Sequence, residues 1–183
     1  MIYPNNFPTL KINNEYILRE QKFDDASDFF SYISNTQVNK YILAPIPKTL
    51  EEAKEDIIYW IDLYYKKAGI YWAICEAKTN KMIGAIGFHD INIINNRGEI
   101  SYDLCSNYWQ KGIMNLAMLQ IIKFGFEHLE LERIQASTIK ENIASIKLLE
   151  KNNFTYEGCL RNYRRHNNKY YNIEFYSILK NEQ

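Results

Sequence analysis

The stretch EISYDLCSNYWQKGIMNLAMLQIIKFGFEHLELERIQASTIKENIASIKLLEKNNFTYEG, residues 99–158, decides the fold of this 183-residue chain. Alternating apolar and polar residues predict a strand at its start, and longer apolar spacings predict helices. The expected order is strand, helix, strand and helix over residues 97–105, 114–129, 133–139 and 142–152. Strands and helices that alternate in this way favour a mixed α/β domain.

Two amphipathic patterns within this stretch predict which side chains face the core. In the strand, Ile100, Tyr102 and Leu104 form an apolar face, and Glu99, Ser101 and Asp103 form a polar one. In the first helix, the expected core-facing stripe consists of Leu116, Leu119, Ile122, Phe126 and Leu129.

The rest of the chain extends the same architecture on both sides. A strand and two helices are expected at 15–20, 24–33 and 49–67, with Thr49 as the N-cap of the longer helix. Strands at 69–77, 81–91 and 97–105 are separated by turn-rich segments and predict an antiparallel meander. Two closing strands at 154–160 and 170–180 flank a basic loop, 161–169. No linker or repeat is present, so residues 1–183 are expected to form one domain.

Composition and charge exclude several classes of protein. Lys plus Arg and Asp plus Glu number 22 each, so nothing marks a nucleic-acid or anionic-membrane binder. The three cysteines lack metal-ligand or disulfide-framework spacing, so no metal site is expected. The N-terminus does not resemble a secretory signal, and no stretch approaches the roughly 18 apolar residues of a membrane span. We therefore expect a cytoplasmic protein.

Gly112 stands where a strand and a short loop give way to a helix. The first N–H groups of a helix lack partners within the helix, and its dipole favours an anion there. Lys111 adds a positive charge beside these amides. Taken locally, Gly112 is either an ordinary turn residue or part of a phosphate cradle.

Residues 99–158 resemble the acyl-CoA-binding core of the GNAT acetyltransferases. The matching pieces are YWQKGIMNLA, ERIQAST, NIASIKLLEKNNF and YEGCLR. The resemblance is to the branch with the bacterial ribosomal-protein N-terminal (alanine/serine) acetyltransferases, and it spans nearly the whole chain. It implies the GNAT fold, a mostly antiparallel twisted sheet of about seven strands flanked by about four helices. Met114 departs from the family's small residue, and Asn153 takes a usual glycine position that Asn can fill.

This resemblance implies acetyl-CoA as the donor and assigns residues to it. Pantetheine would run beside the strand that ends at Leu104 and Cys105. The pyrophosphate would lie on backbone amides of Gln110, Lys111, Gly112, Ile113, Met114 and Asn115. Asn142 and Ser145 match the family's polar contacts near the thioester, although Asn142 is equally well placed as a plain N-cap.

Attack of an amine on a thioester requires a proton acceptor, because alkylamines are mostly protonated near neutrality. The candidate base is Glu99, whose alternative role is that of a solvated or ion-paired strand carboxylate. Asp103 is a second candidate, and His89 is a candidate proton relay. A backbone N–H near Leu104 is the expected oxyanion donor.

The family's usual general acid is a Tyr on the helix that follows Asn142. Leu149 occupies the matching position in this chain, so Ser145 is the expected substitute. Cys105 and Cys159 are expected to be buried, inert thiols rather than acyl carriers. The resemblance implies direct transfer between donor and acceptor within a ternary complex.

The residues give less information about the identity of the amine acceptor than about the donor. The basic segment 161–169 is either a solvated hairpin loop or a wall of the acceptor cleft that meets carboxylates. The acidic start of the 49–67 helix either suits a polyamine or an aminoglycoside or simply faces water. The resemblance favours a protein N-terminal amine; a small-molecule amine, such as a polyamine, aminoglycoside or amino acid, and a non-catalytic acyl-CoA-binding module are the alternatives. The protein is expected to be a monomer or a homodimer.

Overall fold

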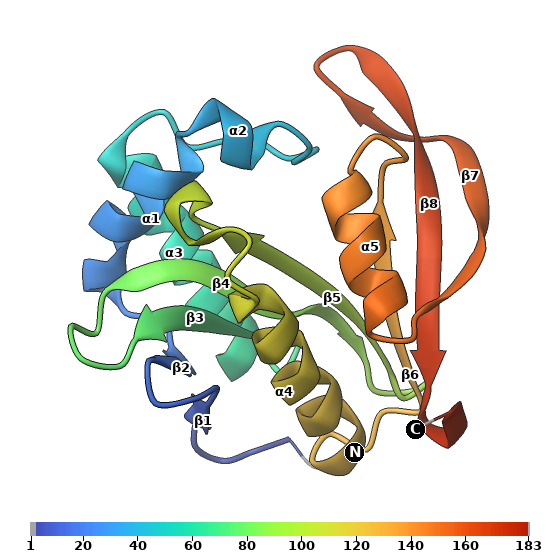
Figure 1. Cartoon of the computed structure of the whole chain (residues 1–183), viewed down its shortest axis with the longest axis horizontal. Coiled ribbons are helices and arrows are strands. Elements are labelled where there is room, and N and C mark those ends of the chain that lie inside the picture. The colour runs from blue at the N-terminus through green and yellow to red at the C-terminus, as the bar shows by residue number, and fades with distance from the viewer. Residues whose placement is uncertain (1–2, 183) are drawn as a thin grey trace.

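The computed structural model describes residues 3–182 and consists of one eight-stranded sheet with helices on both faces (Figure 1). The strands are β1 Leu10–Lys11, β2 Tyr16–Glu20, β3 Ile70–Glu76, β4 Met82–Asn92, β5 Arg97–Leu104, β6 Arg133–Thr138, β7 Thr155–His166 and β8 Lys169–Leu179. The α-helices are α1 Ala26–Ile33, α2 Thr36–Asn39, α3 Leu50–Tyr65, α4 Ile113–Glu127 and α5 Ile143–Lys151. Short 3-10 turns lie at Phe23–Asp25, Ser106–Tyr108 and Lys180–Glu182.

The strand order is β1-β2-β3-β4-β5-β6-β8-β7, and β5–β6 is the one parallel pair in this order. The predicted mixed α/β class, the mostly antiparallel sheet and the meander of β3, β4 and β5 are confirmed. The short strand β1 and the one-turn helix α2 are additions that the sequence did not predict, because elements of two and four residues carry no periodic signal.

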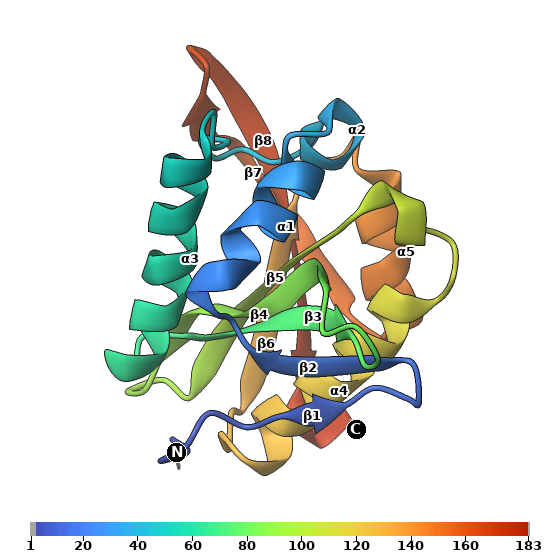
Figure 2. The ribbon, with the colours of Figure 1, turned by 90° about the vertical axis from the view of Figure 1, so that its left-hand side faces the viewer.

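The sheet separates two hydrophobic cores, one beneath each layer of helices (Figure 2). Helices α4 and α5 cover the larger core, which contains the fully buried Trp72 and Phe88. Helices α1 and α3 cover the smaller core on the other face, where Tyr71 and Ile57 are buried. Because side chains of a strand alternate between faces, each central strand contributes to both cores.

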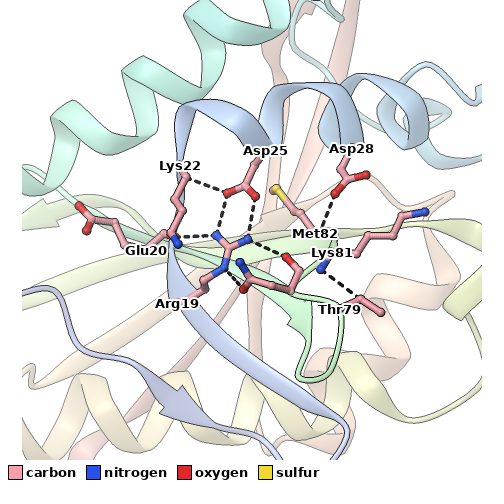
Figure 3. A network of polar contacts seen from close by, with 9 residues as sticks. Arg19, Glu20, Lys22, Asp25, Asp28, Thr79, Lys81 and Met82 are labelled. Atoms are coloured by element: carbon pink, nitrogen blue, oxygen red, sulfur yellow. Dashed lines mark hydrogen bonds and ion pairs between the residues drawn. The ribbon is translucent and has the colours of Figure 1, made fainter.

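A buried ion pair fixes the start of α1 to the sheet (Figure 3). The Arg19 guanidinium donates two hydrogen bonds of 2.7 Å to the Asp25 carboxylate, and its Nε donates to Asn80 Oδ1 at 2.7 Å. One turn further, Asp28 accepts the backbone N–H of Met82 at 3.1 Å. A planar guanidinium suits such bidentate pairing, and loss of either partner would leave an unpaired buried charge. These bonds hold β2, α1 and the β3–β4 hairpin in one arrangement.

The predicted stripe of α4 is wrong for two residues. Leu116 and Leu119 are 38% and 48% exposed, whereas Ile122, Phe126 and Leu129 are buried as predicted. The residues that replace them in the core are Ile113, Ala117, Met118 and Ile121. Because apolar residues surround most of this helix, their spacing does not single out one face, and packing against the sheet decides it.

The predicted loop 161–169 is also wrong. β7 continues to His166 and β8 begins at Lys169, so the segment is mostly strand. The reversal takes place at Asn167 and Asn168, whose φ angles are 46° and 60°. Two consecutive left-handed residues are typical of a two-residue hairpin turn, and Asn tolerates this conformation. Among residues 3–182, no helix is long and apolar enough to cross a membrane.

Candidate active site

The central feature of the site is the point at which β5 and β6 separate. The two strands pair only at Arg97 with Arg133, Gly98 with Ile134, and Glu99 with Gln135. Beyond Glu99, β5 continues to Leu104 along β4 while β6 diverges from it (Figure 1). The β5 edge that faces β6 is therefore open along half its length, and an open strand edge can pair with an extended ligand.

Leu104 lies at the end of this open edge. The backbone N–H of Cys105 donates to Ile83 of the β3–β4 hairpin at 2.8 Å. Because successive strand residues direct their backbone groups to opposite edges, the N–H of Leu104 is directed away from β4. The carbonyl of Leu104 accepts the indole N–H of Trp109 at 2.8 Å. Cys105 itself packs partly buried beside the α1–α3 core, so only its backbone lies on the route predicted for pantetheine.

The start of α4 has the features of an anion site. Gly112 is the N-cap residue with a φ of 75°, and no side chain caps the helix. A Cβ at Gly112 would meet no atom within 4 Å, so the left-handed φ and not crowding favours glycine. The first helical N–H bond is that of Leu116 to Gly112, which leaves the amides of residues 113–115 without helical partners.

The side chains around this helix start leave its amides accessible. Gln110 is left-handed with a φ of 61°, and the exposed Lys111 lies with its Nζ 5.0 Å from the centre of the Tyr108 ring. Asn115 Oδ1 accepts a hydrogen bond of 3.2 Å from Asn152 of α5, so its side chain turns toward α5. Met114 is half-buried against the larger core. These residues fit a pyrophosphate, and their contact with it stays a prediction.

Two hydroxyl groups meet on the face of β5 that α5 covers. Ser145 Oγ lies 2.7 Å from Tyr102 Oη, and the Ser145 backbone N–H donates to Asn142 Oδ1 at 3.3 Å. The N-cap role of Asn142 is thus confirmed, and its contact with the cofactor stays a prediction. Burial raises the pKa of Tyr102 to about 12, so its phenol is protonated at neutral pH. Leu149 is fully buried and supplies no hydroxyl.

Tyr102 is a site residue that the sequence did not reveal. Its position on the apolar face of the strand indicated a core residue, and much of its ring does pack against the larger core. Only the neighbouring helix, which is distant along the chain, brings the Ser145 hydroxyl to it. The regular alternation of the strand could place the ring but not its partner.

Glu99 lies on the opposite face of β5, at the fork between the strands. Its carboxylate accepts a hydrogen bond of 2.7 Å from Ser137 Oγ and one of 3.0 Å from Gln135 Nε2, both on β6. His89 Nε2 lies 3.9 Å from Glu99 Oε1. His89 is the extra residue where the β4–β5 register shifts, which places its ring beside the fork.

The electrostatic surroundings keep His89 neutral. Burial lowers the pKa of His89, the nearby Glu99 and Asp90 carboxylates oppose this effect, and the positive charge of Arg164 lowers the pKa further. The buried Nδ1 atom has no hydrogen-bond partner among the described residues. The predicted candidates Glu99 and His89 are therefore brought together, with one carboxylate and one neutral imidazole facing the same space.

Asp103 is held away from this fork. Tyr32 of α1 donates a hydrogen bond of 2.6 Å to its carboxylate, and desolvation raises the pKa of Asp103 to about 6. Next to it, Ser101 donates to Tyr71 Oη at 3.1 Å, and the Tyr71 ring stacks on Trp60 at 4.2 Å. Asp103 thus ties the end of β5 to α1, which favours its role as a strand anchor over that of a base.

The prediction that Cys105 and Cys159 are both buried is wrong. Cys105 is half-buried and Cys159 is exposed on β7. The reason lies in the sheet order, since β7 is an edge strand and presents most of its residues to solvent. Desolvation and the Glu174 carboxylate raise the pKa of the Cys159 thiol, which disfavours its nucleophilic thiolate. Residues 3–182 contain no cluster of His, Cys, Asp and Glu that could hold a metal ion.

A forked sheet with an uncapped helix start at one side defines an acyl-CoA-dependent transferase of the GNAT type. Comparison with known families agrees: residues 16–155 match the acetyltransferase (GNAT) domain, so the chain belongs to this family. The predictions that it is a GNAT-type N-acetyltransferase and that it uses acetyl-CoA are confirmed.

Individual relatives support this membership. The chain is 35% identical over 174 residues to the uncharacterized N-acetyltransferase YoaA of Bacillus subtilis (strain 168), covering 95% of this chain and 98% of YoaA. It is 28% identical over 106 residues to the ribosomal-protein-serine acetyltransferase of Escherichia coli (strain K12), covering 58% and 59%. The chain shares its fold with the solved structure of RimL, a ribosomal L7/L12 alpha-N-protein acetyltransferase in complex with coenzyme A. The TM-score is 0.83 at 19% identity, and the match covers 96% of this chain and 100% of the RimL chain.

Proposed function

We propose that this enzyme transfers an acetyl group directly from the thioester of acetyl-CoA to a protein N-terminal amine, such as that of a ribosomal protein. The observation that carries the proposal is the fork between β5 and β6, whose two faces bear different groups. One face carries the α4 amides, Asn142 and the Ser145–Tyr102 pair, and the other carries Glu99 and His89. Donor and acceptor can therefore approach one gap from opposite faces.

The donor side is formed mainly by the backbone. The amides of residues 110–115 would bind the pyrophosphate, because they are unpaired and lie at the positive end of the α4 dipole. The open edge of β5 up to Leu104 and Cys105 would pair with the pantetheine amides. The Leu104 N–H is directed toward the same edge, where it would stabilise negative charge that develops on the carbonyl oxygen. Bound acetyl-CoA supplies the activated acyl group.

The acceptor side supplies the base. Glu99 would accept a proton from the incoming ammonium or amine, directly or through water, and Ser137 and Gln135 orient its carboxylate. His89 is neutral and adjacent, so it can relay that proton toward solvent. On the donor side, Ser145 would protonate the departing thiolate, with Tyr102 hydrogen-bonded behind it. Neither face places a cysteine thiol between donor and acceptor.

The names of two relatives support a protein acceptor. RimL is described as an alpha-N-protein acetyltransferase, and the Escherichia coli relative as a ribosomal-protein-serine acetyltransferase. A ribosomal acceptor would place the reaction in the cytoplasm. A small-molecule amine is the second candidate, because Glu51, Glu52, Glu55 and Asp56 cluster on the first turns of α3. Burial, and to a smaller extent the charges of Glu52 and Glu55, raises the pKa of Asp56. A cluster of carboxylates would attract a polyamine.

One assay separates these acceptors. Acetyl-CoA consumption is measured with peptides bearing free N-termini, with the same peptides blocked at the N-terminus, with polyamines and with aminoglycosides. We expect turnover with free peptides and none with blocked ones. Turnover with polyamines alone would replace the proposed acceptor, and cofactor binding without any turnover would indicate a binding module. Failure to bind CoA would overturn the whole assignment.

A further inference from the structure

The β7–β8 hairpin carries two neighbouring arginines that point to opposite faces of the sheet. Arg164 pairs with Tyr171 and Arg165 pairs with Tyr170, and successive strand residues face opposite sides. Arg165 Nη2 donates to Asn168 Oδ1 at 2.8 Å. The Arg164 side chain is exposed, and among residues 3–182 it has no ion-pair or side-chain hydrogen-bond partner. One arginine therefore stabilises the hairpin turn, and the other is available to a ligand.

The register of β8 places Arg164 on the acceptor side of the fork. Along β8, Tyr171, Phe175 and Ser177 face the same side because they are an even number of residues apart. Ser177 lies opposite Gln135, which donates to Glu99. Arg164 shares the face of its partner Tyr171, and hence the face of Glu99. Its effect on the His89 pKa is an independent sign that its charge reaches the fork.

A bulge in β7 bends the end of the hairpin. Between the pairs Leu160–Ile173 and Arg164–Tyr171, β7 has residues 161–163 where β8 has only Asn172. Asn162 adopts a φ of 52°, and its N–H donates to Asn172 Oδ1 at 2.8 Å. Figure 1 shows the hairpin end bent away from the straight course of lower β8. Bulges of this kind bend a strand and redirect the side chain that follows, here Arg164.

Among residues 3–182, no carboxylate forms an ion pair with Arg164. Glu99, the carboxylate at the fork, already accepts hydrogen bonds from Ser137 and Gln135. An exposed guanidinium presents a planar set of N–H donors that can bind a carboxylate through two parallel hydrogen bonds, which a lysine cannot do. The missing partner of Arg164 is therefore expected from the acceptor.

We propose that Arg164 is a specificity-determining residue that binds a carboxylate of the acceptor close to the amine that is acetylated. Two kinds of acceptor have this chemistry: a peptide with an acidic residue next to its N-terminus, and a free amino acid with its own α-carboxylate. The inference rests on the proposed function, since it names the substrate class of the same site. It also gives a role to the basic segment 161–169.

The test compares matched acceptors in the wild type, Arg164→Gln and Arg165→Gln. One pair consists of peptides with aspartate or asparagine in the second position, and the other of alanine and alaninamide. The wild type should prefer the carboxylate member of one pair by roughly tenfold or more in kcat/KM. Arg164→Gln should lose that preference, with a change of at most about twofold for the amide member. Arg165→Gln should keep it.

The pair that shows the preference identifies the source of the carboxylate. A wild type without preference in either pair, or an Arg164→Gln variant that keeps it, would overturn the role of Arg164. Turnover of the asparagine peptide in the same experiment would leave the proposed function intact. If no acceptor is turned over, calorimetric binding of the peptide pair to the CoA complex still tests Arg164. NMR titration of His89 should show a higher pKa in Arg164→Gln, because a nearby positive charge is removed.

Discussion

The two faces of β5 at the fork are assembled in different ways. The donor face uses backbone amides of α4, the N-cap of α5 and one hydroxyl pair, all from residues 102–145. The acceptor face collects single side chains from four strands: His89 on β4, Glu99 on β5, Gln135 and Ser137 on β6, and Arg164 on β7. The donor face is thus a local structure, whereas the acceptor face exists only once the sheet is complete. Substitutions in the α4 amide cradle should therefore weaken CoA binding, whereas those on the acceptor face should leave it unchanged.

The largest effect is expected at the acceptor face from Glu99→Gln. A general base commonly contributes about 10²- to 10⁴-fold, so kcat should fall by that amount. The affinity for CoA should remain unchanged, because Glu99 lies on the face of the strand opposite Tyr102 and Ser145. Ser137→Ala is the matched control: it removes one hydrogen bond to the carboxylate and should cost only a few-fold in rate. Unchanged rates for Glu99→Gln at every pH would leave Glu99 as a structural carboxylate.

The second effect concerns stability at the point where β5 is anchored to α1. The pKa of Asp103 is about 6 in the folded protein, against an ordinary value of 3.8. Because the folded state binds this proton more tightly, its stabilising contribution is complete below the ordinary value and is lost as pH rises through about 6. The loss amounts to at most about 3 kcal/mol.

Asp103→Asn retains an acceptor for the Tyr32 hydroxyl but cannot ionise. The difference in unfolding free energy between this variant and the wild type should therefore grow as pH is raised from about 4 to about 7. Urea unfolding at several pH values measures it. The wild-type curve alone is not sufficient, because other groups also change stability with pH. Arg133 lowers the pKa of Glu157 to about 2, so Glu157 makes the protein less stable as pH falls, and this contribution cancels when the two proteins are compared. Parallel pH curves for the two proteins would contradict desolvation of Asp103.

The contrast between the faces also explains what the sequence could predict. The strand and helix order, the Asn142 cap and the left-handed Asn153, with a φ of 62°, each depend on a few neighbouring residues. The turn at Asn167–Asn168 had a local signal as well, but the run of cations before it suggested a loop. Tyr102 had no such signal, and Arg164 was indicated only as one member of the basic segment 161–169. Their roles depend on α5 and on the β7 bulge, that is, on tertiary contacts between residues far apart along the chain.

The third effect tests the donor face at Gly112. Asp and Asn both tolerate a left-handed backbone, and a Cβ at Gly112 meets no neighbour, so both substitutions should fold. Only Gly112→Asp places a negative charge beside the amides proposed for the pyrophosphate. The CoA dissociation constant, measured by calorimetry, should rise roughly thirtyfold in Gly112→Asp, about 2 kcal/mol, and by much less in Gly112→Asn. Equal weakening in both variants would show that Gly112 serves the turn and not the phosphate.

The smallest effect is expected from the hydroxyl pair at the thioester. Ser145→Ala should lower kcat about fivefold, or about 1 kcal/mol, because a thiolate leaves fairly readily without an acid. It also leaves the Tyr102 hydroxyl without its partner, which should lower the free energy of unfolding by about 1 kcal/mol. Adding Tyr102→Phe removes the unpaired hydroxyl, so the double variant should regain this stability. If both hydroxyls serve one proton path, the double variant should be no slower than Ser145→Ala alone. If the fall in kcat of the double variant equals the product of the falls in the two single variants, Tyr102 acts on the donor independently of Ser145. The donor face, which consists mainly of backbone groups, would then contain a second side chain with its own part in the chemistry.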